Sequence, residues 1–259
     1  MIKEKLDKSF NLDNRKKLCD SLHCSYFLID DQYILRNKEN RFDPCIEVSF
    51  EREMVEFLEG KDISEDIIYF NVHTGQKLSK YQSLIKLSDN PTDKEIELVV
   101  TKIKELHSIT GYKNRFNPFF MIDMYKRGIK SEIDSSFEER VINEAKKLYE
   151  KYPLVFSHNK LDKENVLFND DQAFFVNFEY GGNNITLFDL VSFINENKII
   201  DKEKVFALYG DVDLKDFELI KNLQNILWYY NAKYYYLKTK RSIYKKIAQS
   251  YLDEIKKEA

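Results

Sequence analysis

Two short polar segments of the sequence contain side chains whose types could transfer protons or hold metal ions. The first, SHNKLDKENVLF at residues 157–168, contains His158, Lys160 and Asn165. The second begins at Asn177 and includes Glu179 and Tyr180. A carboxylate, an imidazole and amides are groups that transfer protons or hold metal ions, but a charged lysine accepts no hydrogen bond. The two segments therefore suggest a site for proton transfer or metal binding that includes a cation, Lys160.

Predicted short strands place these two segments next to each other. Apolar runs at 155–156, 166–168 and 173–176 are typical of strands that flank loops. A strand, a loop, a hairpin and a second loop then follow in order along the chain. We therefore expect the two polar segments to lie side by side in one site.

The first part of the chain predicts a small lobe of strands and helices. Apolar residues recur at helical spacing over 1–20 and over 47–59, and Gly60 ends the second helix. Asp30 and Asp31 suit the turn of a hairpin between the first two strands. Strands are predicted at 26–29, 33–36, 67–72 and 76–81.

The second part of the chain predicts a larger, mostly helical lobe. Helices are predicted at 92–109, 137–152, 187–195, 202–209, 216–237 and 241–257. The sequence thus predicts an α+β fold of two lobes within one domain. The small β-rich lobe is expected at residues 1–82 and the helical lobe at 83–259.

Composition excludes several classes of protein. Hydrophobic residues make up 43% of the 259 residues and aromatic residues 14%, which argues against disorder. A net charge of −3 gives no general attraction to nucleic acid or to an anionic membrane. The three cysteines form no CxxC pair, and no apolar run has the length of a membrane span. We therefore expect a cytoplasmic protein without a disulfide framework.

The two polar segments resemble the motifs of a known family. The choline/ethanolamine kinases, and the wider aminoglycoside-phosphotransferase-like group, carry HNDxxxxN in the first loop and D[FW]E in the second. The stretches 33–36, 69–78, 106–108 and 227–229 are similar to other pieces of the same family, so the resemblance covers nearly the whole chain. It implies a protein-kinase-like fold with ATP as the nucleotide.

The resemblance implies nucleotide and metal roles for several residues. Arg36 would contact nucleotide phosphates, and Glu53 would pair with it, with Glu51 as the alternative. Asn165 and Asn177 occupy positions that hold the metal and the nucleotide in the family. Glu179 would lie near metal and substrate. The same resemblance expects Asp189 to hold the first loop through backbone hydrogen bonds.

The resemblance also implies a site for a cationic substrate. Tyr180, Trp228 and Tyr229 could surround a quaternary ammonium ion such as choline, because such ions favour aromatic faces. Core packing is the alternative for Trp228 and Tyr229. Asn231 stands where the family has a second tryptophan.

Two substitutions change the chemistry that the resemblance implies. Lys160 stands at the position of the catalytic aspartate and Asn177 at that of the metal-binding aspartate. Loss of a general base costs about 10²–10⁴-fold in rate. His158 fits a loop-anchoring role better than a catalytic one, and the segment 18–24 lacks the glycines that would cover a nucleotide.

These departures leave more than one function open. The favoured prediction is a choline kinase-like pseudokinase, or a strongly impaired phosphotransferase, that acts with a protein partner. The alternative is an active ATP-dependent kinase that phosphorylates the hydroxyl of choline or of a related small molecule, with Glu179 or Asp162 as the acid; a different transferase on the same scaffold is a third possibility. Because the two substitutions add about three positive charges, we also expect Lys160 to contact phosphate and nucleotide to bind without Mg²⁺.

Overall fold

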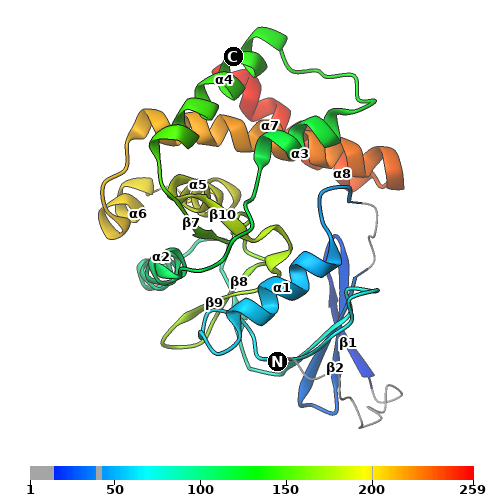
Figure 1. Cartoon of the computed structure of the whole chain (residues 1–259). Helices are drawn as coiled ribbons and strands as arrows, with labels where there is room; N and C mark the ends of the chain where they lie inside the picture. The colour runs from blue at the N-terminus through cyan, green and yellow to red at the C-terminus, as the bar shows by residue number, and fades with distance from the viewer. Residues whose placement is uncertain (1–14, 39–42, 200) are drawn as a thin grey trace.

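The computed structural model describes residues 15–38, 43–199 and 201–259. Its first part is a five-stranded antiparallel sheet in the order β1-β2-β3-β5-β4, with one helix, α1 (Val48–Leu58), beside it (Figure 1). The strands are β1 (Arg15–Asp20), β2 (Cys24–Ile29), β3 (Tyr33–Lys38), β4 (Ile67–Phe70) and β5 (Lys77–Lys80).

The hairpin predicted around Asp30 and Asp31 is confirmed. Ile29 faces Tyr33 across β2 and β3, and both aspartates adopt left-handed backbone conformations, with φ of 49° and 52°. Aspartate tolerates this conformation better than most residues do.

The helix predicted over residues 1–20 is wrong for its last six residues. Arg15–Asp20 forms β1 at the edge of the sheet, where its backbone pairs with β2. All six residues are exposed, so apolar spacing carried little information there and backbone pairing with the hairpin decided the conformation. Residues 1–14 lie outside the described part of the chain.

Seven helices build the larger part of the described chain, and the long helix α7 lies at its centre. In Figure 1, α7 runs across the helical part with α3, α4 and α8 close by. Its bulky residues Phe217, Ile220, Leu223 and Leu227 are almost fully buried. The helices are α2 (Asp93–Ser108), α3 (Pro118–Lys126), α4 (Ser135–Lys151), α5 (Thr186–Glu196), α6 (Lys202–Tyr209), α7 (Leu214–Thr239) and α8 (Ser242–Glu258).

Two small sheets lie where the two parts meet, and they hold the polar loops. β7 (Leu154–Ser157) pairs with β10 (Gly182–Ile185), while β8 (Val166–Phe168) pairs with β9 (Ala173–Phe175) and with β6 (Ile85–Lys86). The first polar loop connects β7 to β8, and the second connects β9 to β10. The predicted side-by-side placement of the two loops is thus confirmed.

The predicted α+β architecture is also confirmed, with a sheet-rich first part and a helical remainder. Among the elements that were not predicted are α3, β6 and β10. α3 begins at Pro118 after the capping residue Asn117, and β10 has the sequence GNNI, which carries no strand pattern. None of the helices in the described ranges is long and apolar enough to cross a membrane.

Candidate functional site

A cavity of about 350 Å³ lies between the sheet and the helical part. Its walls come from the β1–β2 turn, from β3 and β5, from the segment 81–84, from both polar loops, and from α7 and α8. Six residues predicted for the site line this cavity: Lys160, Asn165, Asn177, Glu179, Tyr180 and Trp228. The other four do not line it: Arg36, Glu53, His158 and Tyr229.

Asp189, on α5, fixes the backbone of the first loop. Its fully buried carboxylate accepts hydrogen bonds from the backbone N–H of His158 at 2.9 Å and of Asn159 at 2.6 Å. This is the role that the sequence predicted for Asp189. Hydrogen bonds to a carboxylate are stronger than those between neutral groups. The two bonds to Asp189 therefore fix the backbone of the first loop against α5.

Asn159 joins the two polar loops. Its backbone is left-handed, with φ of 69°, and its side-chain N–H donates to the carbonyl of Tyr180 at 2.8 Å. Its side-chain oxygen accepts a hydrogen bond from Asn184 at 2.7 Å. Asn159 therefore keeps the second loop at a fixed distance from the first.

His158 holds the backbone and faces away from the cavity. Its Nε2–H donates to the carbonyl of Val176 at 2.9 Å, and its Nδ1 accepts from the backbone N–H of Lys160 at 3.2 Å. Burial lowers the pKa of this fully buried imidazole, so it is neutral. Because both ring nitrogens are occupied, His158 has no free atom with which to take a proton from a ligand.

Lys160 points its ammonium group at the helices of the larger part. Nζ lies 3.2 Å from Glu196 Oε2, 3.8 Å from Asp162 Oδ2 and 4.3 Å from the ring centroid of Trp228. The expected direct contact between Lys160 and phosphate finds no support in this arrangement, because the ammonium is already held by an acidic and aromatic pocket.

Asp162 is a carboxylate of the cavity with an unusual pKa. Burial raises its pKa to about 6, although the Lys160 ammonium opposes the shift. Asp162, one of the two acids expected for the alternative of an active kinase, lines the cavity. The carboxylate of Asp162 accepts a hydrogen bond from the backbone N–H of Glu164 at 3.1 Å. Asp162 follows position 160, the predicted position of the catalytic aspartate, by two residues.

The amides of Asn165 and Asn177 are bonded to each other. Asn177 Nδ2 donates to Asn165 Oδ1 at 3.0 Å, and Asn165 Nδ2 donates to the Lys160 carbonyl at 2.9 Å. Asn177 Oδ1 in turn accepts from Tyr26 at 3.3 Å and from Arg36 at 3.4 Å. The side-chain oxygens at both predicted metal positions therefore have protein donors.

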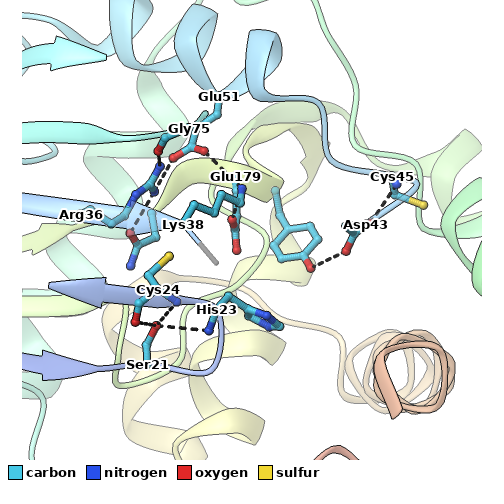
Figure 2. Close-up of polar contacts among 12 residues, drawn as sticks. Ser21, His23, Cys24, Arg36, Lys38, Asp43, Cys45, Glu51, Gly75 and Glu179 are labelled. Atoms are coloured by element: carbon cyan, nitrogen blue, oxygen red, sulfur yellow. Dashed lines mark hydrogen bonds and ion pairs between the residues drawn. The ribbon is translucent and has the colours of Figure 1, made fainter. Parts of the chain in front are cut away.

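A chain of buried ion pairs runs beside these amides (Figure 2). Arg36 Nη1 lies 2.5 Å from Glu51 Oε1, Lys38 Nζ lies 3.5 Å from Glu51 Oε2, and the same Nζ lies 2.7 Å from Glu179 Oε2. Arg36 Nη2 also donates to the carbonyl of Gly75 at 2.8 Å. Arg36 and Glu51 are each about 1% exposed, so Arg36 is a buried structural cation here.

The predicted pairing of Arg36 with Glu53 is wrong, and the alternative, Glu51, is the partner. Glu53 is exposed and accepts a hydrogen bond from Asn114 at 3.1 Å. Residues two apart on a helix lie on different faces, and in α1 the face of Glu51, Met54, Val55 and Leu58 is the buried one.

The buried charges shift each other's pKa. Burial alone would raise the pKa of Glu51 and of Glu179, but the cations outweigh it: Arg36 and Lys38 lower the pKa of Glu51, and Lys38 lowers that of Glu179. For Lys38, burial would lower the pKa, but Glu179 and Glu51 raise it above the ordinary value. All three groups are therefore charged at neutral pH.

The predicted aromatic residues separate into two groups. Tyr180 and Trp228 meet at the cavity edge to face, with ring centroids 5.2 Å apart. Tyr229 instead lies in the core, where its hydroxyl accepts from the backbone N–H of Glu132 at 3.2 Å. One helical step of 100° between neighbouring residues sends Trp228 and Tyr229 in different directions, so core packing, the alternative, holds for Tyr229.

The sequence did not predict several side chains that line the cavity or contact the site residues. Lys38 could have been found, because it follows Arg36 by two positions on a strand and so shares its face. Glu196 and Tyr251, which bond to each other at 2.7 Å, are distant in sequence from the polar loops and left no signal. Asp43 is also new: it accepts hydrogen bonds from Tyr125 and Tyr235.

The site has few carboxylates that could bind a metal ion. In the described ranges, no three or more His, Cys, Asp or Glu side chains are grouped so that they could hold a metal ion. Mg²⁺ is usually held by carboxylates, and at the predicted metal positions the side chains are amides. The nearby carboxylate of Glu179 is paired with Lys38.

The fold matches that of known phosphotransferases. Solved structures of choline/ethanolamine kinases and of aminoglycoside phosphotransferases share the fold, which is the two-lobed protein-kinase-like fold. The family model for choline/ethanolamine kinase matches residues 33–258. The chain therefore belongs to the choline/ethanolamine kinase family.

Individual relatives are distant. The choline kinase LicA from Streptococcus pneumoniae superposes with a TM-score of 0.77 at 18% identity, over 94% of this chain and 93% of that one. A structure of LicA in complex with AMP gives a TM-score of 0.77 at 17% identity, over 95% and 92%. Protein LicA of Haemophilus influenzae is 32% identical over 85 residues, which span 28% of this chain and only 32% of that relative.

Proposed function

We propose that this member of the choline/ethanolamine kinase family binds a nucleotide in its cavity but is a pseudokinase, or at most a strongly impaired phosphotransferase. One observation supports this most directly. The side chains at the base and metal positions, Lys160 and Asn177, are engaged with Glu196, Trp228 and Asn165. Neither is a carboxylate that could receive a proton or hold a metal ion.

Transfer of a phosphoryl group depends on a positioned nucleophile and on neutralised phosphate charge. A charged lysine at position 160 cannot accept the hydrogen bond of an attacking hydroxyl. The residues at the metal positions do not fit Mg²⁺, because both are neutral amides that already have hydrogen-bond partners. The geometry thus supports binding without efficient transfer.

Nucleotide binding rests on the shape of the cavity and on the family. The cavity reaches β3, β5 and the connecting segment at Gln82. LicA, which shares the fold, has been solved in complex with AMP. Half-buried apolar residues of the wall, such as Ile34 and Leu167, together with the polar atoms of the connecting segment, suit the flat base of a nucleotide.

The test is ADP release by the purified protein with ATP, Mg²⁺ and a panel of choline, ethanolamine and sugars. We expect release no faster than the hydrolysis measured without an acceptor. Nucleotide binding is followed in the same samples by thermal shift. Acceptor-dependent turnover by the wild type would overturn the proposal.

An active phosphotransferase is the second candidate, because Asp162 lines the cavity and its pKa is raised to about 6. A carboxylate with that pKa suits a general base near neutral pH. If the wild type turns over an acceptor, Asp162→Asn separates the two candidates. Loss of about 10²-fold or more in turnover would assign the base to Asp162, and unchanged turnover would exclude it.

A further inference from the structure

The ammonium group of Lys160 lies in a pocket of the kind that holds a free organic cation. It is 4.3 Å from the ring centroid of Trp228, 3.2 Å from a Glu196 oxygen and 3.8 Å from an Asp162 oxygen. An aromatic face with anionic groups beside it is the usual receptor for a small ammonium ion. We propose that Lys160 fills a cation site of the cavity as an intramolecular ligand and so keeps free organic ammonium ions out of it.

The receptor side of this contact is built by helices and does not depend on Lys160. Glu196 ends α5, Trp228 lies on α7 and Tyr251 on α8. The Tyr251 hydroxyl contacts both Glu196 oxygens, at 2.7 and 2.9 Å, and so holds the carboxylate beside the Lys160 ammonium. Glu196 and Trp228 will therefore keep their places when the lysine side chain is shortened or neutralised.

Trp228 meets the cation through its ring face. Its side chain is 2% exposed and lines the cavity, and Lys160 Nζ lies 4.3 Å from its ring centroid. A buried aromatic face has little contact with water, so a cation held against it gains more than one at an exposed ring.

The charge balance of the pocket also favours a cation. Lys160 faces the two carboxylates of Asp162 and Glu196, whose side chains are 25% and 11% exposed. Without the lysine charge, both carboxylates would border the tryptophan face with no cation between them. A small ammonium ion that entered there would restore the contacts that Lys160 makes now.

This inference goes beyond the proposed loss of phosphoryl transfer and does not depend on it, because cation binding is measured without nucleotide. The variant is Lys160→Met, which keeps an unbranched apolar stem and removes the charge. Lys163→Met is the matched control, since Lys163 lies in the same loop but pairs with exposed Asp89. The probes are tetramethylammonium chloride, NaCl at equal ionic strength, and tert-butanol as a neutral molecule of similar shape.

Binding is followed through Trp228, the single tryptophan of the sequence. We expect Lys160→Met to bind tetramethylammonium about ten-fold more tightly than the wild type, as one cation–π contact of this strength allows. Lys163→Met should match the wild type, and tert-butanol should bind neither variant. Equal affinity of wild type and folded Lys160→Met for tetramethylammonium would overturn the proposal, as would a gain that survives the further change Glu196→Gln.

A measurement on the wild type covers the case in which Lys160→Met does not fold. Acetylation by an N-hydroxysuccinimide ester is followed at each lysine by mass spectrometry. We expect Lys160 to react about ten-fold more slowly than Lys163, and saturating tetramethylammonium to speed only the reaction of Lys160 by displacing it. No effect of tetramethylammonium at Lys160 would contradict the assigned site.

Discussion

The contacts of individual side chains with other protein groups determine what chemistry the site can perform. Lys160, Asn177 and Glu179 stand at positions for which the resemblance predicts a role in catalysis, and each is bonded to another protein group. Their identities could be read from the sequence, but their partners could not, because Glu196 and Lys38 lie in other elements. The proposed loss of phosphoryl transfer therefore rests both on the identities of these residues and on the contacts that they make.

Glu51 offers the clearest test of the buried ion-pair chain. Glu51→Gln would leave the buried Arg36 guanidinium without its anion, which typically costs about 3 kcal/mol or more. For a chain of this size we expect a fall in Tm of roughly 6–12 °C. Glu53→Gln, two residues away on the exposed side of α1, is the matched control and should shift Tm by less than about 2 °C. Equal effects in thermal melts would show that Glu51 is not the structural partner.

Asp162 predicts a pH effect on stability. Its folded pKa of about 6 lies above the unfolded value of 3.8, so between about pH 4 and 6 the folded state holds more protons and loses stability as pH rises. Asp162→Asn should remove this loss and raise the free energy of unfolding at pH 7 by about 1–3 kcal/mol. The check is urea unfolding of both proteins from pH 4 to 8. A difference that does not change with pH would contradict the raised pKa.

The ion-pair chain should lose stability as pH falls, whereas the Asp162 effect costs stability as pH rises. The pKa values of Glu51 and Glu179 lie below their ordinary values because of the neighbouring cations. Their stabilisation is complete above the unfolded pKa and is lost as pH falls through the folded pKa. We expect the wild type to lose stability below about pH 4, and Glu51→Gln to lose less in the same range. Identical acid profiles would rule out a contribution from Glu51.

At the scale of elements, the site depends on how α5 and the two small sheets hold the loops. Asp189 on α5 supports the first loop, and Asn159 links that loop to the second. The strands β7 and β10 pair directly beneath them. The loops are therefore braced by regular structure on both sides, although their own backbones include the left-handed residues Asn159 and Asn177.

Asp189 should show how much this brace contributes. In Asp189→Asn one side-chain oxygen becomes an N–H that would face a backbone N–H of the loop, so an acceptor is lost in a buried place. We expect a loss of about 2–3 kcal/mol in stability and weaker nucleotide binding. Asp171→Asn, in the exposed β8–β9 turn, is the control and should change stability by less than about 0.5 kcal/mol. Chemical unfolding and thermal shift with ATP measure both effects.

Most elements could be predicted from the sequence where apolar residues followed a clear period. The buried faces of α2 and α4 have this pattern, and Thr92 and Glu95 form the capping box that begins α2. Prediction failed for Arg15–Asp20, which is exposed, and for β10, whose GNNI residues are held by pairing with β7. The Lys160 partner Glu196 on α5 and the cavity residues from α8 were also not predicted, since contacts between distant helices leave no local pattern.

At the scale of the whole molecule, the cavity is the feature that links the sheet to the helical part. Its walls include residues from β1 to α8, so a ligand bound there contacts both parts at once. We keep residue 82 as the proposed division between the lobes, because β5 ends at Lys80 and β6, from Ile85, already pairs with β8. A ligand of the cavity should therefore raise the stability of the whole chain.

Nucleotide should stabilise the protein without a metal ion. At about 100 times its Kd, a ligand adds about 2.7 kcal/mol to the free energy of unfolding, which corresponds to a rise in Tm of roughly 5–10 °C. We expect the same rise with ATP in EDTA as with ATP and Mg²⁺, and no comparable rise with inorganic triphosphate. Stabilisation that requires Mg²⁺ would contradict the proposed metal-free binding.

The most direct test of the account replaces both altered positions together. Lys160→Asp with Asn177→Asp restores the carboxylates of the family motifs, and aspartate tolerates the left-handed backbone of position 177. With ATP, Mg²⁺ and choline or ethanolamine, we expect the double variant to release ADP about 10²-fold faster than the wild type, which should stay at the acceptor-free background. A wild type that turns over an acceptor as fast as the double variant would contradict the account.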